Sequence, residues 1–163
     1  MPVTNERYSF EEQKAVGADG ENMIDEYLSE YYTLRKPPLD SEIRWKFDRF
    51  LINGQKRYTV EYKTDTVAGQ SENLFIETIS NTDTGAPGWA LDSVAQVVCY
   101  LLKGTGRILF LDVVRIRMAL PLWRVNCPSK AVQQDDGSYT HGLLVPIESA
   151  RDEEVILAEL LFS

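Results

Sequence analysis

Two neighbouring segments carry the side chains whose chemistry is most informative. Residues 57–65, RYTVEYKTD, alternate apolar and polar positions as a half-buried strand does, and the polar positions include Glu61 and Lys63. The preceding segment, IRWKFDRFLI at 43–52, carries Asp48. Two carboxylates and an ammonium group suit metal-dependent hydrolysis, because carboxylate oxygens bind hard divalent cations and a lysine can position or deprotonate water. The alternative is an exposed ion pair, which contributes little to stability.

A hairpin would bring these side chains together. The segment NGQK between the two strands contains a strong two-residue turn signal, with the loop at 54–55 or one residue earlier. Opposed residues of an antiparallel pair share a face. The first register places Asp48 opposite Glu61, and the second places Lys46 opposite Glu61. Both registers put Asp48, Glu61 and Lys63 on one face.

Further elements follow from hydrophobic periodicity and capping signals. Ser9 and Glu12 form a capping-box pattern before a helical region that we expect to be broken or kinked near Gly17 and Gly20. A third strand is predicted at 73–80, and Glu77 could approach the site if that strand neighbours the second, although a structural role is favoured. Later predictions are a helix over 89–103, a buried strand over 107–114, helix or strand over 115–125, a turn and strand over 135–147, and a closing helix over 149–161.

Composition places bounds on the class of protein. The 163 residues are 44% hydrophobic and 26% charged, which fits one globular domain that buries about two thirds of its unfolded surface. Cys99 and Cys127 form no metal-ligand or disulfide pattern, and the single histidine, His141, has no nucleophile motif beside it. No secretion signal or membrane span is visible, so we expect a soluble protein of the cytoplasm, or of the host cytoplasm if it is viral.

Charge limits how the chain could hold nucleic acid. The formal net charge is −8, which argues against binding by bulk electrostatics, because phosphate neutralisation needs clustered lysine and arginine. A local basic rim around an acidic site is still compatible with this charge. Its candidate members are Arg35, Lys36, Arg44, Lys46, Arg49, Lys56 and Arg57.

The pattern of Asp48 followed by Glu61-Tyr62-Lys63 resembles the active site of the PD-(D/E)XK nuclease superfamily. Glu21, in GENMID on the preceding helix, stands where many members carry an additional carboxylate, although it could equally be a solvated helix-face residue. The text EYKTD, ENLFIET, GW resembles a phage- and bacteria-associated branch. Phe47 stands where the proline of the motif would be, a departure that many members share.

This resemblance implies a fold and a mechanism. The fold would be a restriction-endonuclease-like three-layer α/β sandwich, a mixed sheet flanked by helices, in a single domain 1–163 with its core at about 9–115 and an accessory part at 116–163. Asp48, Glu61 and the Tyr62 backbone carbonyl would bind Mg²⁺ or Mn²⁺, with Lys63 at the attacking water and Glu21 in support. The reaction would be hydrolysis of DNA to a 5′-phosphate and a 3′-hydroxyl, and a homodimer is an expected partner state.

Two other functions compete with a metal-dependent deoxyribonuclease. The first is a nuclease-fold protein that binds nucleic acid or a protein without cutting, which the acidic charge favours. The second is an unrelated α/β interaction module, which requires Asp48 and Glu61 to lie on opposite faces. Gln96 and Tyr100, expected one helical turn apart, could face a site, but core packing is favoured for Tyr100 and for Trp89.

Overall fold

The computed structural model describes residues 10–38 and 47–162 and has a mixed α/β architecture with two sheets. The large sheet is six-stranded, in the order β1-β2-β3-β6-β7-β10. Strands β3 and β6 pair in parallel and their other neighbours pair antiparallel, so the sheet is mixed. The strands are β1 (Thr33–Arg35), β2 (Arg49–Asn53), β3 (Lys56–Asp65), β6 (Val97–Leu102), β7 (Arg107–Asp112) and β10 (Ile156–Leu161).

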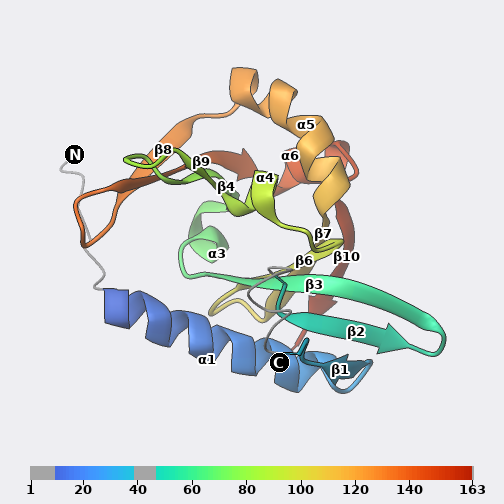
Figure 1. Cartoon of the computed structure of the whole chain (residues 1–163). Helices are drawn as coiled ribbons and strands as arrows, with labels where there is room; N and C mark the ends of the chain where they lie inside the picture. The colour runs from blue at the N-terminus through green and yellow to red at the C-terminus, as the bar shows by residue number, and fades with distance from the viewer. Residues whose placement is uncertain (1–9, 39–46, 163) are drawn as a thin grey trace.

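A second, four-stranded sheet in the order β5-β4-β9-β8 lies over part of the first (Figure 1). Its strands are β4 (Asn73–Asn81), β5 (Ala86–Pro87), β8 (Ser129–Gln133) and β9 (Tyr139–Pro146). The helices are α1 (Phe10–Leu28), α3 (Ala68–Ser71), α4 (Trp89–Asp92), α5 (Val113–Asn126) and α6 (Ile147–Asp152). Helix α1 covers one face of the large sheet, and the small sheet, α4 and α5 lie on the other side. The opposite layer therefore contains strands as well as the helices that were expected there.

Helix α1 packs closely on β3. It runs unbroken through Gly17 and Gly20, so the predicted break was wrong. Gly20 is buried against the large sheet, and a Cβ at this position would lie 1.8 Å from Thr64 Oγ1. Glycine is thus required for the close approach of helix and strand, and the helix tolerates it because Ile24 and Leu28, both fully buried, anchor the same face.

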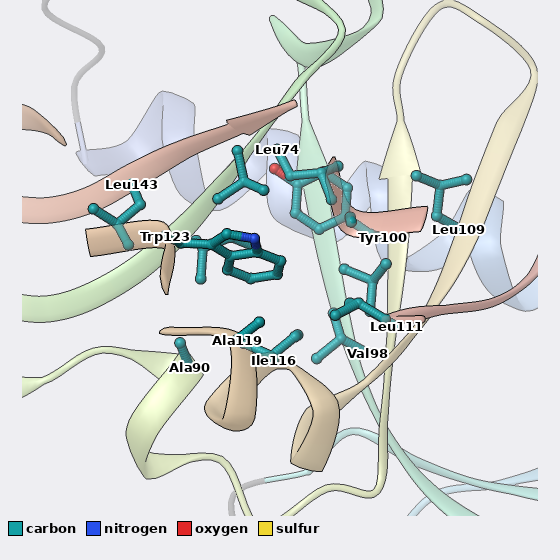
Figure 2. Close-up of a cluster of buried hydrophobic side chains, with 14 of the residues drawn as sticks. Leu74, Ala90, Val98, Tyr100, Leu109, Leu111, Ile116, Ala119, Trp123 and Leu143 are labelled. Atoms are coloured by element: carbon teal, nitrogen blue, oxygen red, sulfur yellow. The ribbon is translucent and has the colours of Figure 1, made fainter. Parts of the chain in front are cut away.

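The larger apolar core lies between the two sheets. Val98 and Tyr100 of β6 lie in one core cluster with Leu74 of the small sheet and Trp123 of α5 (Figure 2). Trp123 is 2% exposed. This packing joins α5 to the small sheet. It explains why α5, a 14-residue helix with Pro121 inside it, is stable.

The helix predicted over 89–103 was wrong. Only Trp89–Asp92 is helical, and Val97–Leu102 form the strand β6, buried at every position between β3 and β7. A short apolar run fits a buried strand as well as a helix, and the β-branched Val97 and Val98 favour the strand. Gly104 and Gly106, both with positive φ, make the β6–β7 turn. Gln96 and Tyr100 are therefore not one helical turn apart.

The closing helix predicted over 149–161 was wrong beyond residue 152. Helix α6 ends at Asp152, Glu154 adopts a left-handed conformation (φ 57°), and residues 156–161 form β10 against β7. Residues 115–125, where helix and strand were both open, lie in α5, whose N-terminus is capped by the Asp112 side chain accepting from Arg115 N (3.1 Å). The buried strand predicted over 107–114 is confirmed for residues 107–112, which form β7, while residues 113–114 begin α5. The turn and strand predicted over 135–147 are confirmed by the turn at Gly137 and by β9.

The part predicted as accessory is built into both sheets, because it supplies β8 and β9 to the small sheet and β10 to the large one. Of the first predicted hairpin strand, residues 43–46 lie outside the described residues, and β2 begins at Arg49 rather than at Phe47. Across residues 10–38 and 47–162, no helix has both the length and the apolar character needed to cross a bilayer.

Candidate active site

The β2–β3 hairpin fixes the position of Asp48. Asn53 pairs with Lys56, so the loop is 54–55, the first of the two registers considered, and Gly54 supplies its positive φ (61°). Asp48 lies just before β2, where its backbone N–H donates to Val60 O (2.9 Å). Its carboxylate Oδ2 accepts a hydrogen bond from Tyr62 N (2.6 Å). A side chain thus continues the strand pairing where the backbone ladder stops.

Glu61 and Lys63 lie next to each other on β3. Val60, which precedes Glu61, and Tyr62, which lies between the two charged residues, belong to the apolar cluster under α1. Glu61 and Lys63 therefore point to the opposite face of the sheet. Lys63 Nζ lies 2.7 Å from Glu61 Oε1, with the side chains 34% and 14% exposed. Burial acts to lower the pKa of Lys63, but the charge of Glu61 and its hydrogen bond, with help from Glu77 and Asp48, raise that pKa above the ordinary value. The lysine is held as an ammonium group.

The backbone carbonyl of Tyr62 lies on the Asp48 side of β3. On the β6 side of β3, the Asp65 carbonyl accepts a hydrogen bond from Lys103 N (2.9 Å). On the β2 side, the Val60 carbonyl accepts a hydrogen bond from Asp48 N. Carbonyl directions alternate along a strand, so Tyr62 and Val60 direct their carbonyls to the same side. The Tyr62 N–H bonds to the Asp48 carboxylate on that side. The three predicted metal ligands Asp48, Glu61 and Tyr62 therefore come from one short stretch of the hairpin.

Glu21 approaches this stretch from α1. Its carboxylate lies 3.8 Å from the Arg49 guanidinium, and its side chain is 42% exposed. Burial and the negative charge of Asp48 raise the pKa of Glu21, while Arg49 opposes the shift. The helix thus brings a further carboxylate within electrostatic reach of Asp48.

Arg49 does not belong to a basic rim, which corrects the expectation for this residue. It is 6% exposed and donates from Nε and Nη2 to Asp25 (3.0 and 2.7 Å) and from Nη1 to Asp48 O (2.8 Å). Asp25 also accepts from Tyr62 Oη (2.9 Å). This network ties α1 to both hairpin strands beneath the site. Its signal in the sequence was the position of Arg49 in the buried register of Phe47 and Leu51.

Glu77, for which a structural role is favoured, makes a structural contact and also acts electrostatically on Lys63. Its strand β4 belongs to the small sheet rather than lying beside β3, yet Glu77 contributes to the raised pKa of Lys63. Burial raises the pKa of Glu77, and the charge of Lys63 opposes this. Oε1 of Glu77 accepts from Trp89 N (3.3 Å), and a Cβ on Gly88 would lie 2.4 Å from the Glu77 carbonyl oxygen. No local pattern in the sequence could pair residues from two different sheets.

The electrostatics of the site favour a cation. Burial is the largest cause of the raised pKa of Asp48, and the charge of Glu61 adds to it. Carboxylates whose ionisation is opposed in this way gain from a positive charge placed between them. Hard oxygen donors suit Mg²⁺ or Mn²⁺. Across the described part of the chain, however, no three or more histidine, cysteine or acidic side chains converge as a metal-binding group. The donors fit in kind, and Mg²⁺ typically takes only one or two protein carboxylates together with water.

The other basic-rim candidates and the predicted residues of 89–103 have the following positions. Arg35, Lys36, Lys56 and Arg57 are exposed, and the Arg57 guanidinium lies 4.9 Å from the Phe50 ring centroid. Arg44 and Lys46 lie outside the described residues. Tyr100 is buried and donates its hydroxyl hydrogen to Asp65 while accepting from Phe75 N (3.0 Å), which joins the two sheets. Gln96 exchanges hydrogen bonds with Thr59 (3.0 and 3.1 Å), and Trp89 is a core residue.

Comparison with known proteins returned no relatives: no protein-family model matches the chain, and no curated protein or solved structure matches it. The assignment of a function therefore depends on the residues of this site.

Proposed function

We propose that this protein is a metal-dependent nuclease of the PD-(D/E)XK type, with a restriction-endonuclease-like core, that hydrolyses DNA phosphodiester bonds. The observation that carries the proposal is the hydrogen bond from Tyr62 N to the Asp48 carboxylate beside the Glu61–Lys63 ion pair. A stabilising surface pair needs no second carboxylate anchored at the end of the neighbouring strand. A metal-dependent hydrolase does.

Each residue has a role that follows from its contacts. Asp48 has one oxygen committed to Tyr62 N and Glu61 has one committed to Lys63, which leaves Asp48 Oδ1, Glu61 Oε2 and the Tyr62 carbonyl to bind a metal ion. A bound Mg²⁺ or Mn²⁺ would polarise the scissile phosphate and lower the pKa of a coordinated water. Lys63 would donate hydrogen bonds to the attacking water or to a phosphate oxygen and offset developing negative charge. Glu21 would hold water on the α1 side.

Substrate access is supported by the basic residues near the hairpin. Lys56 and Arg57 are exposed near its tip, Arg35 is the last residue of β1 and Lys36 follows it, so positive charge is available although the chain as a whole is acidic. Local phosphate contacts of this kind position nucleic acid without reading its sequence. DNA is thus the proposed substrate. Contacts of this kind predict no preference for a particular DNA sequence.

The test is cleavage of plasmid, linear duplex, single-stranded and branched DNA in the presence of Mg²⁺, Mn²⁺ or EDTA. Wild type is expected to cut at least one substrate only with metal. Lys63→Ala is expected to lose roughly 10²-fold or more of the rate, the size typical for removal of a charge-stabilising donor. Lys103→Ala is the matched control, because Lys103 forms an equally short ion pair with Asp19 (2.8 Å) away from the site.

Metal binding gives a second measurement that does not depend on turnover. Calorimetric titration with Mn²⁺ should detect binding to wild type and a loss of affinity in Asp48→Asn, a variant that keeps the acceptor for Tyr62 N. Cutting that persists in EDTA or in Lys63→Ala would contradict the proposal. Wild type that binds DNA and cuts none of the four substrates would instead support the non-cutting nuclease-fold protein.

A further inference from the structure

Helix α5 carries an apolar stripe on its outer face. Val114, Met118, Leu122 and Val125 are spaced four, four and three residues apart, so they lie along one side of the helix. Their exposed fractions are 61%, 68%, 47% and 82%. We call these four residues the α5 stripe. It extends roughly 16 Å along the helix axis.

The opposite face of the same helix is already used. Ile116, Ala119, Leu120 and Trp123 are buried in the core between the sheets (Figure 2 shows three of them). A helix that is apolar on both faces is normally covered on both faces. Helix α1, by contrast, buries Ile24 and Leu28 and exposes polar residues such as Asn22 and Glu26. The α5 stripe is thus an exposed apolar surface with no counterpart on α1.

From these observations we infer that the α5 stripe is the surface on which a second copy of this chain docks, with the two α5 helices antiparallel. The stripe is symmetric about its own centre, with valine at each end and Met118 and Leu122 inside. A two-fold axis through that centre places Val114 of one copy beside the partner's Val125. Such self-complementarity is what an isologous dimer contact needs. The inference does not depend on the proposed function.

Charge also favours a second copy at this face. The chain has a net charge of −8, so two copies repel each other over most of their surfaces. None of residues 113–126 is acidic, and Arg115, on the flank of the stripe, is paired with Glu154 (3.2 Å). Two α5 helices can thus approach without bringing carboxylates of the helices themselves together, and the nearby Glu154 is neutralised by Arg115.

The area is compatible with a dimer. A standard interface covers roughly 800 Å² of each partner, about 8% of the 9931 Å² surface of this chain. Exposed apolar residues of and after α4 add to the stripe: Arg117 of α5 donates to Ala90 O (3.0 Å), and Leu91 and Val94 beside it are 42% and 53% exposed.

The exposed edge strand β10 is the competing surface for self-association. Leu157 is 56% exposed there, but the register of β10 against β7 shifts between Ile156 and Ala158. Glu159 on the same strand is bound by Arg107 and Arg151 (both 2.6 Å). Irregular pairing and charges are the features that protect an edge from further strand addition. This leaves α5 as the favoured contact.

The first experiment is analytical ultracentrifugation of wild type, Met118→Glu and the matched control Leu157→Glu over a range of concentrations. Wild type should be in a concentration-dependent monomer–dimer equilibrium. Met118→Glu should weaken dimerisation by about tenfold or more, the effect of disrupting a central interface residue, while Leu157→Glu should leave it unchanged. Circular dichroism of each variant establishes that a lost dimer is not a lost fold.

Cysteine cross-linking tests the antiparallel orientation. In a Cys127→Ser background, mixing Val114→Cys with Val125→Cys protein should give a disulfide-linked heterodimer, whereas Val114→Cys alone should not cross-link. Cross-linking of Val114→Cys alone would overturn the antiparallel arrangement. A wild type that is monomeric at every concentration, or a dimer lost in Leu157→Glu and kept in Met118→Glu, would overturn the proposed surface. Flotation of monomer with phosphatidylcholine–phosphatidylserine vesicles would assign it to a membrane instead.

Discussion

Strands β3 and β6 are parallel neighbours in one sheet, yet they differ sharply on one face. In their register Glu61 pairs with Val98, and Lys63 pairs with Tyr100. Toward α1 both strands are apolar, but on the other face β6 is buried in the inter-sheet core while β3 carries an ion pair. The sheet therefore changes from apolar packing to charge within one strand spacing, about 4.8 Å.

The difference indicates that the ion pair on β3 is not there for stability. Apolar residues of similar volume at a partly buried position usually stabilise a fold as well as an ion pair does, or better. The neighbouring strand shows that the sheet can be apolar on this face. Charged residues kept where apolar ones would pack are expected at functional sites.

The largest effect on stability is expected when a carboxylate is introduced on the apolar strand β6. Val98→Glu places a carboxylate at a position with 0% exposure, next to Glu61, which already holds Lys63 in an ion pair. It should cost about 3–5 kcal/mol of the free energy of unfolding, the usual cost of an unpaired buried charge. Urea unfolding followed by circular dichroism measures this. A stable Val98→Glu protein would show that the two strands are not as different as the packing implies.

The next effect concerns the α1 side of β3. In Gly20→Ala the new methyl group would lie 1.8 Å from Thr64 Oγ1, so helix and strand must separate, which should cost roughly 1–3 kcal/mol. Gly17→Ala is the matched control, because nothing lies within 4 Å of its Cβ, and it should stabilise the helix by up to about 1 kcal/mol. Equal melting temperatures for both variants would contradict this account of α1 packing.

A smaller effect of the opposite sign is expected for the double variant Glu61→Val with Lys63→Leu. Making β3 resemble β6 should leave stability unchanged or raise it by up to about 2 kcal/mol, because a desolvated ion pair is replaced by apolar contacts. DNA cleavage should be abolished in the same variant. Substantial destabilisation would mean that the ion pair supports the fold, and would weaken the functional interpretation.

The smallest effect depends on pH. Because burial and the charge of Glu61 raise the pKa of Asp48, the folded state binds the proton more tightly than the unfolded state. Ionisation of Asp48 therefore lowers stability as pH rises above the ordinary carboxyl value of about 3.9. Asp48→Asn should be more stable than wild type by at most about 1 kcal/mol at neutral pH, with the gain vanishing near pH 3.5. Urea titrations across this range measure the difference; a gain that grows toward acid pH would contradict it.

The local part of the site could be predicted from the sequence. The turn at 54–55 and the alternation of Glu61 and Lys63 fix one face of the hairpin, and the structure adopts one of the two registers that this pattern allowed. Glu77 could not be predicted, because it reaches the site from another sheet. The burial of Arg49 could not be predicted, because a charged residue is normally exposed. In the structure Arg49 is bound by Asp25 of α1, which is 24 residues earlier in the sequence.

The errors in the fold have a related cause. Val97–Leu102 is apolar on both faces, so periodicity could not separate a buried strand from a helix. Residues 156–161, ILAELL, contain good helix formers, and their strand conformation is imposed by pairing with β7. In both segments tertiary contacts override local preference.

The position of β10 has a consequence for synthesis in the cell. Its partner β7 is 45 or more residues earlier in the chain, and all the proposed site residues precede β7. During translation the hairpin and α1 leave the ribosome while the large sheet still lacks one edge strand, leaving the outer edge of β7 without its partner. Emergence of residues 156–161 closes that edge. The large sheet thus reaches its six strands only after a segment 45 or more residues beyond its paired residues in β7 has been synthesised.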